Sequence, residues 1–146
     1  MWFGTIGRGA FRLQHGKLTE YSRRTGLSGD QVKAIARDSQ GRIWIGTEKS
    51  IDILEDGRIL EPLPQIRDLG VISISILHED RAGRMWFSAD VQGLHVLDGG
   101  NLRRFDRTSG LRCQALHFLS DHGKAPARVA GACSLDGCIE REQVGL

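Results

Sequence analysis

Apolar and polar residues alternate along this 146-residue chain in short runs, and the runs recur every 42 residues. Alternation with a period of two predicts β-strands, because successive side chains of a strand point to opposite faces. Segments containing Gly and Asp separate the runs at gaps too short for helices, so we expect successive strands to pair as antiparallel hairpins. In the second unit the alternating positions are Val32, Ala34 and Ala36, then Ile43 and Ile45, then Ile51 and Ile53, then Ile59 and Leu63.

Tryptophan marks the repeat most clearly. Trp2, Trp44 and Trp86 are 42 residues apart and lie in the tetrapeptides WFGT, WIGT and WFSA. Asp38 and Gly41 recur as Asp80 and Gly83, which indicates a turn that enters a strand. Three apolar columns keep the same spacing: Leu27, Leu69 and Leu111; Val32, Ile74 and Leu116; Ile35, Leu77 and Leu119.

Four short strands in each repeat of 42 residues are the pattern of a β-propeller blade. We therefore expect an all-β chain, a single partial β-propeller over residues 1–146, with about three to four four-stranded antiparallel blades. The units run over about 1–27, 28–69, 70–111 and 112–146. The first begins inside a repeat and holds three strands, and the last is degenerate, because Arg128 stands where a fourth tryptophan is due.

The tryptophans are expected to be structural anchors of the blades. An indole between adjacent sheets buries a large area and needs one partner for its N–H group. Packing between sheets requires a large side chain in every unit, whereas a single binding site would not require a tryptophan in each one. The glycine two residues after Trp44 would allow close approach of the next sheet.

Composition excludes several classes of function. Lys and Arg number 20 and Asp and Glu 18, interspersed, so neither nucleic acid nor a membrane surface is an expected partner. The sequence contains no stretch approaching the ~20 apolar residues of a transmembrane helix, and no export signal at its start.

No catalytic constellation, cofactor motif or metal-ligand spacing is evident, so we expect no enzyme activity, no cofactor and no metal. Glu79 and Asp80 form an acid pair, but neighbouring strand residues point to opposite faces, which favours turn and rim roles. Cys113, Cys133 and Cys138, with His117 and His122 between them, could suggest a zinc site, but their spacings match no standard framework. Cys133 and Cys138 flank a four-residue turn and are either free thiols or a disulfide across a hairpin.

Arginines fall in each connection between units, at Arg23 and Arg24, Arg67, and Arg107. Their near-periodic spacing predicts one rim of the propeller, where loops of such folds bind ligands. Two interpretations remain open: solvated loop charge, or a polar rim for an anionic or hydroxyl-rich ligand such as an acidic oligosaccharide.

The recurring strand, Asp, Gly, Trp-x-Gly-Thr pattern resembles the two-component regulator propeller repeat. Three segments carry the resemblance, VKAIARDSQGRIWIGT at 32–47, ISILHEDRAGRMWFSADVQGLHVLD at 74–98 and WFGTIGRGAFRL at 2–13. The resemblance implies a sensing propeller, usually of seven blades, in the periplasm or elsewhere outside the cytoplasm of a bacterium. In that family the propeller is joined through a membrane helix to a histidine kinase or a diguanylate cyclase.

The resemblance therefore predicts a non-catalytic, ligand-sensing fragment of a signal receptor. Its expected partners are a small molecule or oligosaccharide, and the missing blades or another copy of the receptor. Exposed sheet edges would favour such association. The alternatives are a protein interaction scaffold and, less favoured, a fragment of a propeller lyase or hydrolase.

Overall fold

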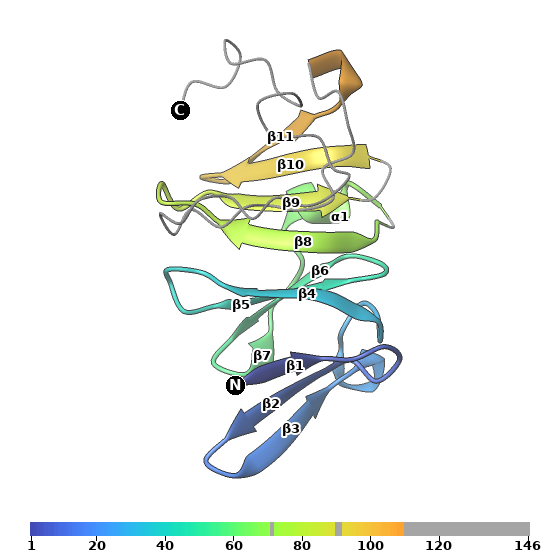
Figure 1. Ribbon diagram of the computed structural model, residues 1–146, viewed down its shortest axis with the longest axis vertical. Coiled ribbons are helices and arrows are strands. Elements are labelled where there is room, and N and C mark those ends of the chain that lie inside the picture. The colour runs from blue at the N-terminus through green and yellow to red at the C-terminus, as the bar shows by residue number, and fades with distance from the viewer. Residues whose placement is uncertain (71, 90–91, 110–146) are drawn as a thin grey trace, which may run out of the picture.

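A computed structural model describes residues 1–70, 72–89 and 92–109, which form three antiparallel sheets (Figure 1). Sheet 1 has three strands in the order β1-β2-β3, and sheets 2 and 3 have four each, in the orders β4-β5-β6-β7 and β11-β10-β9-β8. The predicted strand pattern, three strands in the first unit and four in each of the next two, is confirmed. The fourth unit and all three cysteines lie outside the described residues.

Each sheet is one sequence unit folded as a meander. Sheet 1 contains β1 (Trp2–Gly4), β2 (Ala10–Gln14) and β3 (Lys17–Tyr21). Sheet 2 contains β4 (Val32–Arg37), β5 (Ile43–Thr47), β6 (Ile51–Glu55) and β7 (Arg58–Ile59). Sheet 3 contains β8 (Ile74–Glu79), β9 (Met85–Ala89), β10 (Gly93–Asp98) and β11 (Asn101–Phe105). The connections carry η1 (Arg23–Thr25), α1 (Pro64–Arg67) and η3 (Arg107–Ser109).

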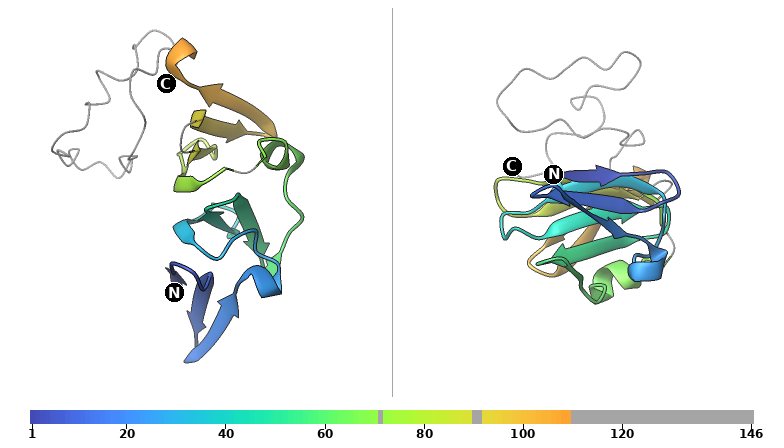
Figure 2. Two further views of the ribbon diagram at one scale, coloured as in Figure 1. Left: turned by 90° about the vertical axis from the view of Figure 1, so that its right-hand side faces the viewer. Right: turned by 90° about the horizontal axis from the view of Figure 1, so that it is seen from below.

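The sheets pack face to face in the order of the sequence (Figures 1 and 2). β4 is the first strand of sheet 2, and it contacts β1 on one side and β8 on the other. The first strands of the second and third units, β4 and β8, thus lie side by side, as they do around the axis of a propeller, and β1 lies next to β4 on the other side. The architecture is a partial β-propeller, as predicted.

The core lies between the sheets. One cluster joins sheets 2 and 3 around Trp44 and Phe87, whose side chains are 2% and 0% exposed. A second cluster joins sheets 1 and 2 around Tyr21, Ile45 and Leu54. Because each sheet buries its apolar faces only against its neighbours, the stability of each unit depends on the next one.

Two details of the repeat recur in sheets 2 and 3. The pairing register shifts between Val32 and Ala34 in β4 and again between Ile74 and Ile76 in β8, so both inner strands carry the same irregularity. Gly46 lies at the closest approach of these sheets, since a Cβ built there would be 2.7 Å from Ile74 Cγ2. This contact confirms the close approach that the glycine predicts.

The end of the second unit differs from the sequence prediction. The alternating pattern extends the last strand to Leu63, whereas β7 ends at Ile59 and Leu63 precedes the short helix α1. Pro62 and Pro64 flank Leu63. A proline has no N–H to donate to a strand ladder and favours the first positions of a helix, which explains the change.

Candidate functional site

The turn between β4 and β5 places a buried carboxylate beside Trp44. Asp38 Oδ2 accepts hydrogen bonds from Trp44 Nε1 at 2.8 Å and from Arg42 Nε at 2.7 Å. Its other oxygen accepts the Arg42 backbone N–H at 2.8 Å, and the guanidinium carbon lies 5.7 Å from the centre of the Trp44 ring. Burial opposes ionisation, yet these hydrogen bonds outweigh it and lower the pKa of Asp38.

Sheet 3 repeats the arrangement with Asp80, Arg84 and Trp86. Asp80 Oδ2 accepts from Trp86 Nε1 at 2.8 Å and from Arg84 Nε at 2.7 Å. Burial would raise the pKa of Asp80, but the bonds from Trp86 and Arg84 lower it to about 2. We call each Asp, Arg and Trp set a carboxylate clamp. In both sheets the indole is buried beside a carboxylate of its own sheet, and the role of these tryptophans as anchors between sheets stays a prediction.

Glu79 and Asp80 are adjacent acids that make different contacts. Asp80 belongs to its clamp, whereas Glu79 reaches the neighbouring sheet. Glu79 Oε2 accepts the Ser39 backbone N–H at 2.7 Å, and Oε1 accepts the Ser39 hydroxyl at 2.9 Å. Glu79 therefore links sheet 3 to the β4–β5 turn of sheet 2, while Asp80 stays in the turn of its own sheet.

Asp52 and His95 occupy the same place in successive sheets, because Asp52 pairs with Ile45 and His95 with Phe87. Asp52 accepts hydrogen bonds from the backbone N–H and hydroxyl of Ser28. Burial dominates over these bonds and raises the pKa of Asp52. Sequence reasoning missed both residues. The sequence shows a polar residue within an apolar strand, but it does not show which side chain or backbone group will contact that residue in the folded sheet.

His95 is fully buried and stacks on Phe87, with 5.2 Å between ring centres. Among the described residues neither of its ring nitrogens has a hydrogen-bond partner. Burial, and then the charge of Arg104 on the neighbouring strand, lower the pKa of His95. Burial in this sheet therefore favours the neutral imidazole over the charged one.

The arginines predicted as a rim lie in the connections between sheets. Arg23 and Arg24 are in η1 and Arg67 ends α1, and Figure 2 shows both segments on the same side of the molecule. The side chains of Arg24 and Arg67 are 88% and 69% exposed, each 4.0 Å from a carboxylate of Glu20 or Asp68. Arg107 begins η3, in the connection after sheet 3.

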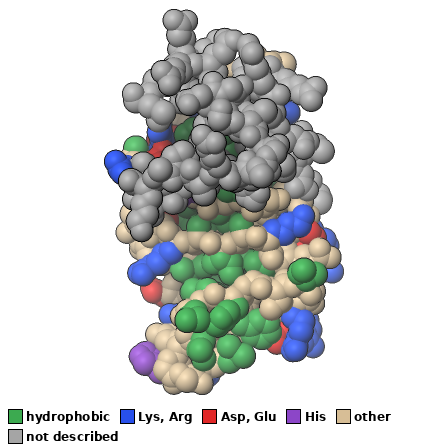
Figure 3. All heavy atoms as spheres, viewed as in Figure 1, with side chains coloured by type: hydrophobic (Ala, Val, Ile, Leu, Met, Phe, Trp, Pro, Cys, Tyr) green, Lys and Arg blue, Asp and Glu red, His purple; other side chains and the backbone are tan. Residues whose placement is uncertain are grey.

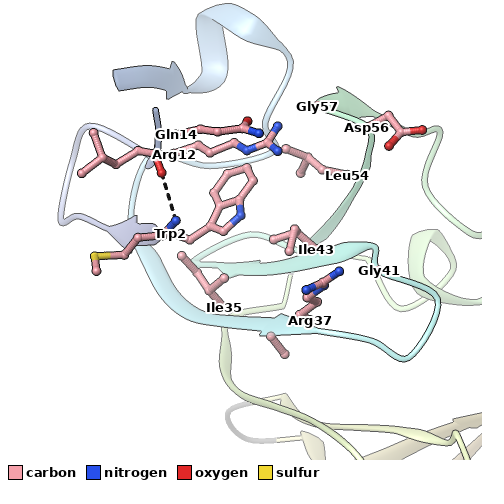
Figure 4. Close-up of a pocket in the computed structure, with 13 residues that line it drawn as sticks. Trp2, Arg12, Gln14, Ile35, Arg37, Gly41, Ile43, Leu54, Asp56 and Gly57 are labelled. Atoms are coloured by element: carbon pink, nitrogen blue, oxygen red, sulfur yellow. Dashed lines mark hydrogen bonds between the residues drawn. The ribbon is translucent and has the colours of Figure 1, made fainter. Parts of the chain in front are cut away.

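A pocket of about 480 Å³ opens between sheets 1 and 2 (Figure 4). Trp2, Arg12 and Gln14 line it from sheet 1. Its other wall includes Ile35 and Ile43 of sheet 2, and the Trp2 indole points into the space between the walls.

The pocket and the predicted arginines lie at opposite ends of the strands. Gly41, Asp56 and Gly57 line the pocket, and they belong to the turns β4–β5 and β6–β7. In an antiparallel meander these turns fall at the end opposite to the connections that hold η1 and α1. The pocket lining does not include Arg23, Arg24 or Arg67. These arginines lie together at the other end of the strands, in the connections between sheets.

In the described ranges no group of three or more His, Cys, Asp or Glu side chains is arranged to hold a metal ion. Over the same residues, no helix is long and apolar enough to cross a membrane.

Comparison with known proteins supports the fold and the repeat. Residues 26–49, which include β4, the Asp38 turn and β5, match the family model described as two component regulator propeller. The solved extracellular domain of a putative hybrid two component system from B. thetaiotaomicron is similar in fold, with a TM-score of 0.56 and 20% identity. That match covers 78% of this chain and 18% of that chain. No match was found among the curated proteins.

Residues 26–49, which match the family model, contain all three residues of the carboxylate clamp in sheet 2: Asp38, Arg42 and Trp44. The same short segment therefore carries both the sequence repeat and the hydrogen bonds that recur in sheet 3. Residues 26–49 match the two component regulator propeller model, and the described residues fold as part of a β-propeller.

Proposed function

We propose that this chain is a ligand-sensing segment of a two-component type receptor that acts outside the cytoplasm by binding rather than catalysis. The family match and the similarity to an extracellular domain of a hybrid two component system support this role. In the whole receptor, a ligand that binds one arrangement of the propeller more tightly would shift the population toward it and so bias a remote output domain.

The observation that carries the proposal is the placement of arginine in successive connections. Arg24 and Arg67 are 88% and 69% exposed, and the carboxylates near them are 4.0 Å away, too far for a tight hydrogen-bonded ion pair. A guanidinium presents a planar fork of donors that matches a carboxylate. The chemistry at this end of the strands therefore suits an acidic oligosaccharide.

The test is calorimetric titration of the 146-residue chain with an oligomer of galacturonic acid and with the uncharged galactose oligomer of the same length. We expect the acidic sugar alone to bind, and replacement of Arg23, Arg67 and Arg107 by Ala to weaken its binding at least tenfold. The matched control replaces Arg37, Arg58 and Arg81 by Ala, which removes the same charge from the opposite end of the strands. Equal loss in both variants, or no heat with either sugar, contradicts the proposal.

A further inference from the structure

We propose that His95 is a pH-sensitive switch: when its buried ring takes up a proton, the connection that carries α1 detaches from the core between sheets 2 and 3. The described part of this connection, residues 60–70 and 72–73, leads from β7 to β8. The argument compares it with the connection before sheet 2, residues 22–31, which is fastened by a different set of side chains.

Sheet 2 fastens its incoming connection with hydrogen bonds. Asp52 in β6 accepts the backbone N–H of Ser28 at 3.0 Å and the Ser28 hydroxyl at 2.8 Å. The Ser28 hydroxyl also lies 2.9 Å from the hydroxyl of Thr47, at the end of β5. Ser28 belongs to the connection, so these three residues, which we call the polar tie, join it to the sheet.

Sheet 3 has no polar tie. Each of its three positions holds another residue type: His95 for Asp52, Ala89 for Thr47, and Gly70 for Ser28. Alanine and glycine have no side-chain hydrogen-bonding group. The buried contacts of this connection are apolar, because Ile66 and Ile72 are 0% and 4% exposed in the cluster between sheets 2 and 3.

The position of His95 suits a neutral ring. The imidazole is fully buried and stacks on Phe87 with 6° between the ring planes. In the described part of the chain, neither ring nitrogen has a hydrogen-bond partner. Phe87 belongs to the same cluster as Ile66 and Ile72. A proton on His95 would therefore place an unpaired charge beside the side chains that hold the connection, which apolar surroundings strongly disfavour.

The charged group nearest to His95 also opposes its protonation. Burial, and then the charge of Arg104 opposite it on β11, lower the pKa of His95, and the Gly93 backbone and the Asp106 carboxylate offset this only in part. From β5, β6 and α1, the side chains in the Phe87 cluster are not ionisable: Trp44, Ile51, Ile53 and Ile66.

The other charged side chains on the packed elements are exposed or already paired. They are Glu55 and Arg58 beside the β6–β7 turn, Glu79, which is bonded to Ser39, and Arg67, which lies beside Asp68. On the face drawn in Figure 3, hydrophobic side chains likewise lie in the middle of the molecule and charged ones at its margins. No described carboxylate is therefore placed to stabilise a charged His95 in the core.

The direction of the pKa shift sets the pH window. Because the pKa of His95 is lowered from its ordinary value of 6.5, the neutral ring stabilises the closed connection above pH 6.5, and this contribution is lost as the pH falls through the lowered pKa. Burial raises the pKa of Asp52, so its protonation in acid is not opposed in this way. Mild acid should therefore open the connection before sheet 3 and leave the one before sheet 2 closed.

Opening would also displace Arg67, the last residue of α1. Acid should then weaken ligand binding at the connections, and this consequence alone rests on the proposed function. The experiment below contains no ligand, so its result is independent of that function.

Amide hydrogen exchange of the full chain, followed by nuclear magnetic resonance, tests the switch. The Ile72 amide bonds Lys49 O of sheet 2 at 2.9 Å, and the Val32 amide bonds Thr5 O of sheet 1 at 2.9 Å, so the two report on the two connections. From about pH 7.5 to about pH 5.5, after correction for intrinsic exchange, protection of Ile72 should fall at least about tenfold. Protection of Val32 should stay constant, which separates local opening from unfolding of the chain.

Substitutions assign the effect to His95. His95→Phe introduces the residue type that sheet 1 has at this position, Phe11, and His95→Gln keeps a neutral polar side chain. Neither can take up a proton, so Ile72 should be equally protected at both pH values, and His95→Gln decides if His95→Phe does not fold. The matched control, His15→Phe in an exposed turn, should open as the parent does.

Arg104→Gln tests the direction of the effect. It removes the positive charge that lowers the pKa of His95, so the imidazole titration and the loss of Ile72 protection should both move to higher pH. Four results would overturn the proposal: constant Ile72 protection in the parent chain, the same loss in the His95 variants as in the parent, an equal loss at Val32, or opening of Arg104→Gln only at lower pH.

Discussion

Sheets 1 and 2 share a repeat sequence but differ in one strand, and the difference isolates what that strand contributes. In sheet 2 the indole of Trp44 is 2% exposed and donates to Asp38 at 2.8 Å. In sheet 1 the indole of Trp2 is only partly buried and lines an open pocket. The first strand and the turn after it therefore supply both the covering surface and the carboxylate that together hold a tryptophan between sheets.

The largest expected effect is on the buried tryptophan. Trp44→Ala should lower the free energy of unfolding by roughly 3 to 5 kcal/mol, because it leaves a cavity between sheets 2 and 3 and removes one of the hydrogen bonds to Asp38. Trp2→Ala should cost only about 1 kcal/mol, since its side chain is partly exposed. Urea denaturation measures both. Equal costs would contradict the comparison.

A smaller effect is expected where the sheets approach most closely. Gly46→Ala should cost about 1 to 3 kcal/mol, because the new Cβ would lie 2.7 Å from Ile74 Cγ2 and 3.0 Å from Ile74 O. Ser88 occupies the same position in sheet 3, so Ser88→Ala is the matched control: it adds no atom and should change stability less than Gly46→Ala does. Thermal unfolding of both variants checks the difference, and a stable Gly46→Ala would show that the sheets can separate.

The clamps predict a loss of stability in acid. Hydrogen bonds lower the pKa of Asp80 to about 2 from an ordinary value of 3.8, so its stabilisation is complete above pH 3.8 and disappears as the pH falls toward 2. With screening by solvent, the loss is about 1 to 2 kcal/mol. Asp80→Asn should flatten this part of the pH profile of unfolding. A variant as acid-sensitive as the parent would contradict the assignment.

Asp52 should act in the opposite direction. Burial raises its pKa, so it stabilises the fold most when protonated, and this contribution is lost as the pH rises through its raised pKa. Asp52→Asn should therefore remove a decline in stability above pH 3.8 without the acid effect of Asp80→Asn.

The smallest effect is expected at the contact between turns. Glu79→Ala removes two hydrogen bonds to Ser39, but the contact is exposed and should contribute only about 0.5 to 1 kcal/mol. Glu55→Ala, another exposed acid at a strand end, is the control and should change stability by less than about 0.5 kcal/mol. Chemical denaturation of both variants decides whether the turn contact couples sheets 2 and 3.

The sheets could be predicted from the sequence because the residues that define them recur every 42 residues. The tryptophan spacing, the apolar columns and the Asp to Gly turns each repeat, so one unit confirms the interpretation of the next. Sequence reasoning did not predict that β7 stops at Ile59, because the effect of two prolines depends on backbone hydrogen bonds that an apolar pattern does not record. It also failed to find the partner of Asp38, because the Arg42 and Trp44 contacts form only when the turn folds.

The candidate site was less predictable than the fold. Spacing alone placed Arg23, Arg24 and Arg67 in connections between sheets, and the structure agrees. The pocket beside Trp2 had no signal in the sequence, since its lining comes from side chains of two sheets that are far apart in the sequence.

The central claim is that the first strand and its turn hold each tryptophan between sheets, and hydrogen exchange of the indole N–H groups tests it most directly. Nuclear magnetic resonance should show the Nε1 proton of Trp44 exchanging far more slowly than that of Trp2. Exchange of both protons at one common rate would contradict the account.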